Sequence, residues 1–123
     1  MKRTADAAAV AEVMAAYGSG TRARDVEALK AIFHPNAVMS GYLGPELLIG
    51  SPQPFFDHLA ANEVAESYRA ETTAIDVAGA TARARVVEDD LFGMSFVNEF
   101  HLVRSDGRWL IVSKLFHHDA PEG

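Results

Sequence analysis

The chain has 123 residues, a formal net charge of −6 at pH 7 and 49% hydrophobic residues. This length and composition are typical of one globular domain with one core, so we predict a single domain over 1–123. The acidic balance argues against a nucleic-acid partner, which would need clustered Lys and Arg, and the lack of cysteine excludes disulfides, thiolate chemistry and Cys-ligated zinc.

Three helices are expected in the first half of the chain. Apolar residues recur at helical spacing from Thr4 to Tyr17, and the glycines at 18 and 20 are expected to end that helix. Asp25 is a suitable N-cap for a second helix, which Pro35 should end. The third helix is expected to begin at Ser51-Pro52 and to fray near Asn62.

The remainder of the sequence is typical of strands. Two short extended pieces are expected at 37–42 and 47–49, before the third helix. Four longer strands follow it at 67–77, 81–89, 95–104 and 109–117, and turn residues between them predict three consecutive hairpins. Helices followed by an antiparallel meander indicate the α+β class. Both faces of 109–117 are largely apolar, which predicts a homodimer through the outer sheet face.

No targeting or membrane-spanning segment is apparent in the sequence. The N-terminal stretch carries Asp6 and Glu12 instead of an uninterrupted apolar signal region, and no segment approaches the roughly 18 apolar residues that a membrane span needs. We therefore expect a cytoplasmic, bacterial protein with no membrane partner.

The order of elements and two local motifs resemble the nuclear-transport-factor-2-like (NTF2-like, SnoaL-like) superfamily. The motifs are Phe33-His34-Pro35-Asn36-Ala37 and the ending that runs from Phe100-His101-Leu102 through Asp106-Gly107-Arg108-Trp109 to Lys114-Leu115-Phe116-His117. The nearer resemblance is to small bacterial members labelled "putative lumazine-binding". The resemblance implies a cone-shaped curved antiparallel sheet wrapped around the helices, a pocket at the wide end of the cone, dimers through the outer sheet face, and no required cofactor.

The sequence departs from the superfamily pattern at two positions. Asn36 and Asn98 stand where aspartate is common. An amide keeps the hydrogen bonds of a carboxylate but cannot act as a base, so the departure weakens any proton abstraction at position 98.

The last hairpin supplies the best set of candidate pocket residues. With a two-residue turn at Asp106-Gly107, Arg104 faces Trp109 and Asn98 faces Leu115. One face then carries Asn98, Ser113 and His117 as polar points in an apolar wall to which Phe100 and Trp109 belong. A bulge at Gly107 would shift the register by one and bring Glu99 and His101 to the Trp109 face.

Further candidates come from the helices and the first strand, and include Tyr17, His34, Tyr42 and Phe56. His34 also suits a structural role beside the carbonyl groups at the end of the second helix. Glu88 shares its parity with inward-facing alanines, although a solvated position near a loop suits it as well. His117 and His118 are adjacent on a strand and point to opposite faces, so we predict no metal site.

Two functions of different classes fit these residues. One is a non-catalytic homodimer that binds a small, largely apolar molecule in the cone. The other is a cofactor-independent lyase or isomerase, with His117 or His101 as base and Tyr42 or Asn98 as hydrogen-bond donor. A structural dimer with a filled core is a third reading.

Overall fold

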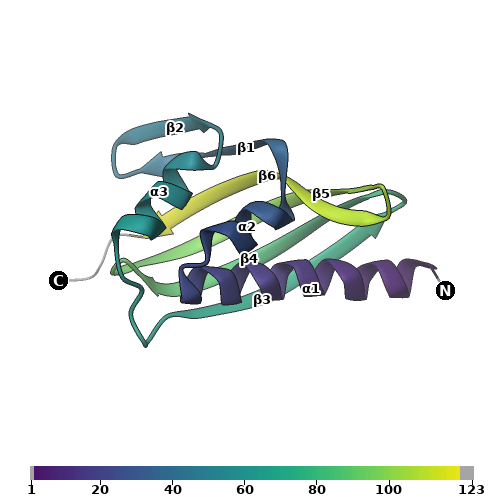
Figure 1. The fold of residues 1–123 in the computed structure, drawn as a ribbon, viewed down its shortest axis with the longest axis horizontal. Helices are drawn as coiled ribbons and strands as arrows, with labels where there is room; N and C mark the ends of the chain where they lie inside the picture. Colours follow the sequence, from purple (N-terminus) through teal and green to yellow (C-terminus); the bar gives the residue numbers. More distant parts are fainter. Residues whose placement is uncertain (1, 120–123) are drawn as a thin grey trace.

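Three helices pack on one face of a curved six-stranded sheet (Figure 1). A computed structural model of the chain describes residues 2–119. The elements in chain order are α1 (Lys2–Ala23), α2 (Val26–Ile32), β1 (Phe33–Leu43), β2 (Glu46–Gly50), α3 (Gln53–Ala61), β3 (Arg69–Ala78), β4 (Thr81–Leu91), β5 (Met94–Ser105) and β6 (Arg108–Asp119). In the described residues no helix is long and apolar enough to cross a membrane.

The strands follow the order β2-β1-β6-β5-β4-β3, so the sheet is open, with β2 and β3 at its edges. Strands β3 to β6 form the predicted antiparallel meander, and β1 joins its far side by pairing in parallel with β6. Long α1 crosses the concave face beside β3, while α2 and α3 cover the β1 side (Figure 1). The predicted α+β class with a strongly curved sheet is confirmed.

The prediction that the first helix stops at its glycines is wrong, because α1 continues to Ala23. Gly18 and Gly20 instead allow close packing. A side chain at Gly18 would lie 3.2 Å from the Ala70 Cβ, and one at Gly20 would lie 2.9 Å from Leu29. The tertiary contacts outweigh the low helix propensity of glycine.

The second helix begins as predicted and ends earlier than predicted. The Asp25 carboxylate accepts a hydrogen bond from the Ala28 amide at 3.1 Å, which is N-cap geometry. The helix ends at Ile32, and Phe33 already has extended backbone and starts β1. The third helix agrees with its prediction to within two residues, and Ser51 Oγ accepts from the Gln53 amide at its start.

The last hairpin starts in the predicted register and then departs from it. Arg104 pairs with Trp109, as a two-residue turn requires. Farther along, Leu102 pairs with Ile111 but His101 pairs with Ser113, so Val112 is an extra residue in β6. Asn98 consequently faces Phe116 and not Leu115. Because side chains alternate along a strand, this bulge exchanges the two faces of β6 beyond Val112.

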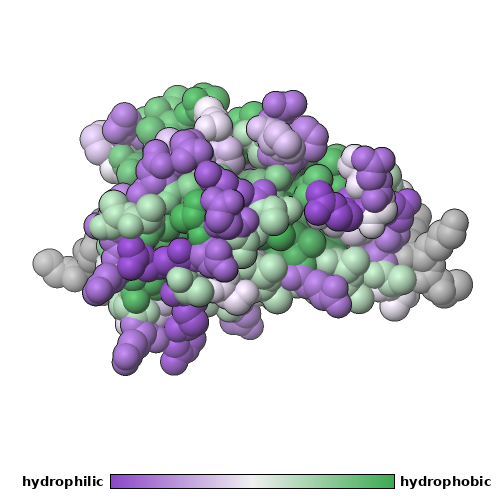
Figure 2. Space-filling model, in the orientation of Figure 1, coloured by the Kyte–Doolittle hydropathy of each residue, from purple (hydrophilic) through white to green (hydrophobic). Residues whose placement is uncertain are grey.

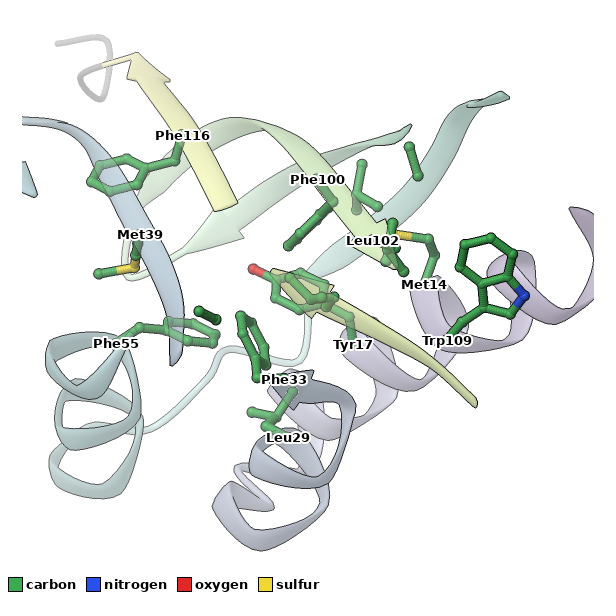
Figure 3. Packing of buried hydrophobic residues seen from close by; sticks show 14 of the residues in the cluster. Met14, Tyr17, Leu29, Phe33, Met39, Phe55, Phe100, Leu102, Trp109 and Phe116 are labelled. Atoms are coloured by element: carbon green, nitrogen blue, oxygen red, sulfur yellow. The ribbon is translucent and has the colours of Figure 1, made fainter. Parts of the chain in front are cut away.

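The core extends along the concave side of the sheet (Figure 3). Trp109, Met14 and Leu102 fill one end, and Met39, Phe55 and Phe116 lie at the other. Tyr17 lies between these groups, with its ring edge-on to Phe100 at 4.9 Å between centroids. Its hydroxyl points toward the end of the core that holds Phe55 and Met39 (Figure 3), so a polar atom enters the apolar interior there.

A single glycine sets the spacing between β1 and β6. Gly41 has φ +151°, and a Cβ at this position would lie 2.3 Å from the Phe116 carbonyl oxygen. We expect Gly41→Ala to lower the free energy of unfolding by about 2 kcal/mol, because the strands must separate or the backbone must strain. Urea denaturation would measure the change. Gly50→Ala, whose Cβ would meet nothing within 4 Å, is the control, and equal midpoints for the two variants would contradict the expectation.

Candidate functional site

A cavity of about 210 Å³ opens between α3, the β1–β2 hairpin and the ends of β4, β5 and β6. Its wall is almost entirely apolar. The lining residues are Met39, Leu43, Leu48, Pro54, Phe55, His58, Glu88, Leu91, Phe92, Met94, Phe96, Lys114 and Phe116. Only His58, Glu88 and Lys114 bring ionisable groups to it. His58 is exposed, whereas Glu88 and Lys114 are buried, so the interior part of the cavity carries one acid and one amine.

Glu88 is held by hydrogen-bond donors from two elements, α1 and β5, and from the loop before β3. Its side chain is 1% exposed. Oε1 accepts from Tyr17 Oη at 3.2 Å and from Asn98 Nδ2 at 2.6 Å, and Oε2 accepts from Tyr68 Oη at 2.5 Å. Three donors satisfy most of the hydrogen-bonding capacity of a carboxylate, which makes its burial tolerable.

The two tyrosines remain donors over the whole ordinary pH range. Burial raises the pKa of Tyr17 and of Tyr68, and the adjacent Glu88 carboxylate raises both further. Tyr68 is fixed from the outside by Arg22, which donates to its backbone carbonyl and lies over its ring at 5.3 Å from the centroid. These contacts leave the Glu88 carboxylate little freedom to turn.

Lys114 is the second charged group in the interior. Its side chain is 4% exposed, and Nζ lies 3.7 Å from the ring centroid of Phe55 and 5.1 Å from that of Tyr17. Within residues 2–119 no carboxylate comes within ion-pair distance of Nζ. Aromatic faces attract a cation but replace only part of its hydration.

The protonation of Lys114 follows from this environment. Burial lowers its pKa to about 8, and the negative charge of Glu88 opposes that shift only in part. A lysine with a lowered pKa beside a carboxylate, in a cavity, is the kind of group that performs proton transfer or attacks a carbonyl.

The structure brings four of the sequence-predicted residues near this site, but none of them lines the cavity. Asn98 and Tyr17 lie beneath it as donors to Glu88. Phe100 packs on the Tyr17 ring, and Phe56 packs edge-on against Phe33 at 5.5 Å between centroids. The Asn98 amide oxygen is buried and has no hydrogen-bond partner among the described residues.

The candidate bases lie on the opposite face of the sheet. His117 is exposed, and its Nε2 is 3.1 Å from Asp119 Oδ1. His101 is also exposed, and it pairs with the half-buried Ser113, which has the same orientation. The Val112 bulge explains this placement, because it turns Ser113 and His117 outward and Lys114 and Phe116 inward.

Three further candidates are also distant from the cavity. Tyr42 is 58% exposed on the outer face of β1. His34 Nδ1 accepts a hydrogen bond from the Asn36 amide at 3.0 Å, which is a local structural role at the start of β1. Trp109 closes the far end of the core, and its Nε1 donates to Asp6 Oδ1 at 3.4 Å.

Sequence reasoning therefore missed the two residues that give the cavity its charge. For Glu88 the available signal was its parity with inward-facing residues of β4, since it alternates in step with Ala82, Ala84 and Val86. No comparable signal existed for Lys114, whose orientation depends on a bulge at an ordinary valine. Among the described residues no group of three or more His, Asp or Glu side chains could hold a metal ion.

Comparison with known proteins identifies the family of this chain. The model of the family described as "Putative lumazine-binding" matches residues 5–117. The chain belongs to this family. Solved NTF2-like proteins of unknown function have the same fold. One, from Shewanella baltica OS155, is 28% identical, with a TM-score of 0.87 over 94% of this chain and 95% of that one.

Two further relatives extend the comparison. A second NTF2-like protein of unknown function, from Silicibacter pomeroyi DSS-3, is 27% identical, with a TM-score of 0.88 over 97% of this chain and 100% of that one. Among curated proteins, a protein of Cladobotryum sp. named aldolase FrzH is 31% identical over 101 residues, which is 81% of this chain and 76% of that protein. The chain is thus similar both to NTF2-like proteins without a known function and to a protein that is named an enzyme.

The lowered pKa of Lys114 predicts a pH-dependent stability. The unfolded lysine, with a pKa of 10.5, binds more protons than the folded one between pH 8 and 10.5, so the free energy of unfolding should rise with pH there. We expect this group to contribute a rise of about 2 kcal/mol between pH 7 and 9.5. The window ends below pH 10, the ordinary pKa of tyrosine, so the tyrosines of the unfolded chain are still mostly protonated within it.

Urea denaturation of the wild type and of Lys114→Met at several pH values would measure this rise. The difference between the two curves removes the contribution of titrating groups that behave alike in both proteins. Parallel curves would show that the folded lysine titrates like an exposed one.

Proposed function

We propose that this protein binds a small, largely apolar molecule in the cavity, with an oxygen-bearing end of the ligand turned toward Lys114. One observation carries the proposal, namely that an apolar cavity of about 210 Å³ has its buried polar groups, Lys114 and Glu88, in its interior and not at its mouth. Specific small-molecule sites commonly combine an apolar wall with a few oriented polar groups.

The cavity volume limits the size of the ligand. Cavities of about 150 Å³ accept benzene, whereas drug-sized ligands occupy about 300 Å³ or more. The volume of about 210 Å³ therefore suits one six-membered ring with a short substituent, or an aliphatic compound of similar size. The rings of Phe55, Phe96 and Phe116 offer flat apolar surface to such a ligand.

A lyase or isomerase activity is the second candidate, and two observations favour it. Lys114 and Glu88 are an amine and a carboxylate in one water-poor cavity, and a relative that is 31% identical is named an aldolase. The bases in this candidate differ from those expected from the sequence, since His117 and His101 lie outside the cavity. Lys114 and Glu88 take their place.

A thermal-shift screen of small compounds would test ligand binding. We expect single-ring alcohols, aldehydes and ketones to raise the melting temperature, with a ligand at a hundred times its Kd adding about 2.7 kcal/mol to stability. Met94→Trp, which fills the cavity, should abolish the shift. Ser95→Trp, at the exposed neighbouring position, should retain it. Absence of any shift, or an equal shift in Met94→Trp, would contradict the proposal.

We also propose that the protein is a homodimer through the outer face of the sheet. Five large apolar residues on the adjacent strands β1, β2 and β6 are exposed by 44% or more, namely Val38, Tyr42, Leu47, Ile49 and Leu115. Figure 2, which views the molecule from the side of the helices, shows that hydrophobic surface reaches the β2 edge of the sheet. Large apolar side chains gathered on one face are typical of a surface that a second copy covers.

Sedimentation at micromolar concentration would test the dimer. We expect the mass of two chains for the wild type and of one chain for Ile49→Lys, because the residue is 71% exposed in the single chain and a buried unpaired ammonium would oppose association. Ser105→Lys, at the exposed end of β5 and away from these apolar residues, should remain dimeric. A single-chain mass for the wild type would refute the dimer.

A further inference from the structure

We propose that the Lys114 amine forms a Schiff base with the carbonyl carbon of a small, apolar aldehyde or ketone bound in the cavity. This inference rests on the proposed function, because it requires the same cavity to be occupied. It adds the ligand class, a carbonyl compound, and a covalent step at a named atom.

The position of Nζ supports a role as nucleophile. Lys114 lines the cavity and is nearly fully buried. Its Nζ lies 3.7 Å from the Phe55 ring centroid, and no carboxylate in residues 2–119 forms an ion pair with it. The nitrogen is therefore not held in a salt bridge that a reaction would have to break. The Phe55 ring attracts the protonated ammonium form of Lys114, but it does not occupy the lone pair when the amine is neutral.

The protonation state makes the amine available near neutral pH. With a pKa of about 8, about a tenth of the Lys114 side chains are neutral at pH 7, compared with roughly three in ten thousand for an ordinary lysine. Desolvation is the established way to prepare a lysine for attack on a carbonyl. Only the neutral amine carries the lone pair that attacks.

The neighbouring charge favours a neutral carbonyl ligand over an anion. Glu88 lines the same cavity and acts on Lys114 through its negative charge. An anionic ligand would gain attraction from Lys114 but suffer repulsion from Glu88, so the net electrostatic gain is small. A neutral aldehyde or ketone avoids this repulsion. The iminium cation that it forms retains the positive charge that Glu88 stabilises.

The covalent step balances without any further reactant. The neutral amine attacks the carbonyl carbon, the N–C bond forms, the π electrons move to the oxygen, and a proton passes from the nitrogen to that oxygen to give the carbinolamine. A second proton on that oxygen allows it to leave as water while the nitrogen lone pair forms the C=N bond. In sum, one lysine ammonium and one carbonyl give one iminium and one water. Glu88, fixed by Tyr17, Tyr68 and Asn98, lies in the same cavity as the cation.

Reductive trapping would test the Schiff base. The purified chain is incubated at pH 8 with benzaldehyde or cyclohexanone and sodium cyanoborohydride, and the modified peptides are quantified by mass spectrometry. The chain contains three lysines, Lys2, Lys30 and Lys114, and Lys30 is exposed, so it reports ordinary amine reactivity. We expect Lys114 to be labelled at least ten times faster than Lys30.

Three variants separate the covalent step from binding. Lys114→Arg should bind benzyl alcohol, a probe without a carbonyl, in a thermal-shift assay but should form no adduct at position 114. Met94→Trp should lose both binding and Lys114 labelling while Lys30 labels normally, and Ser95→Trp should behave as the wild type. Binding of benzyl alcohol without preferential labelling of Lys114 would overturn the Schiff base and leave the proposed function standing. If neither benzyl alcohol nor the two carbonyl probes bind and Lys114 is not labelled preferentially, both the Schiff base and the proposed function are overturned. Fast labelling of Lys114 that persists in Met94→Trp would also overturn the Schiff base in the cavity, because the reaction would then not need the cavity.

Discussion

The buried Glu88 carboxylate is the constraint on which the interior of this protein depends. It draws a donor from α1, a donor from β5 and a donor from the segment before β3 to one point. Burying a carboxylate in an apolar core without such partners costs free energy. The positions of the three donors therefore depend on one another, because each must reach the same carboxylate. The same negative charge is what makes the nearby Lys114 ammonium tolerable in a position where water is largely excluded.

Most of the fold could be predicted from the sequence because the residues that start helices and form turns agree with the spacing of the apolar residues. Asp25 and Pro52 lie where helices begin. Alternating apolar residues mark β4 and β5, and the inward apolar side chains of both strands were assigned correctly. The failures have tertiary causes. Gly18 and Gly20 indicate a helix end only until the residues packed against them, Ala70 and Leu29, are known.

The candidate site was less predictable, because it depends on a single inserted residue. Val112 has no turn-forming or bulge-forming character, yet it exchanges the two faces of β6 and decides that Lys114, not Ser113 or His117, lies inside. Register errors of this kind leave the predicted fold class correct but assign the wrong side chains to the pocket, since each side chain beyond the bulge changes sides. For a curved sheet, recognising the fold therefore identifies the location of a pocket more reliably than its lining.

The parallel pairing of β1 with β6 has a consequence for how the cavity arises during folding. Met39 and Phe116 line the same cavity, although four strands and a helix separate β1 from β6 along the chain. Closing so long a loop is slow relative to forming the hairpins of the meander, because its entropy must be lost before the strand contacts form. On a ribosome that wall cannot close until the last strand has emerged. In a partly synthesised chain that lacks β6, the β1–β2 hairpin and the β3–β5 meander are therefore separate pieces, because β6 lies between them in the sheet, and there is no cavity.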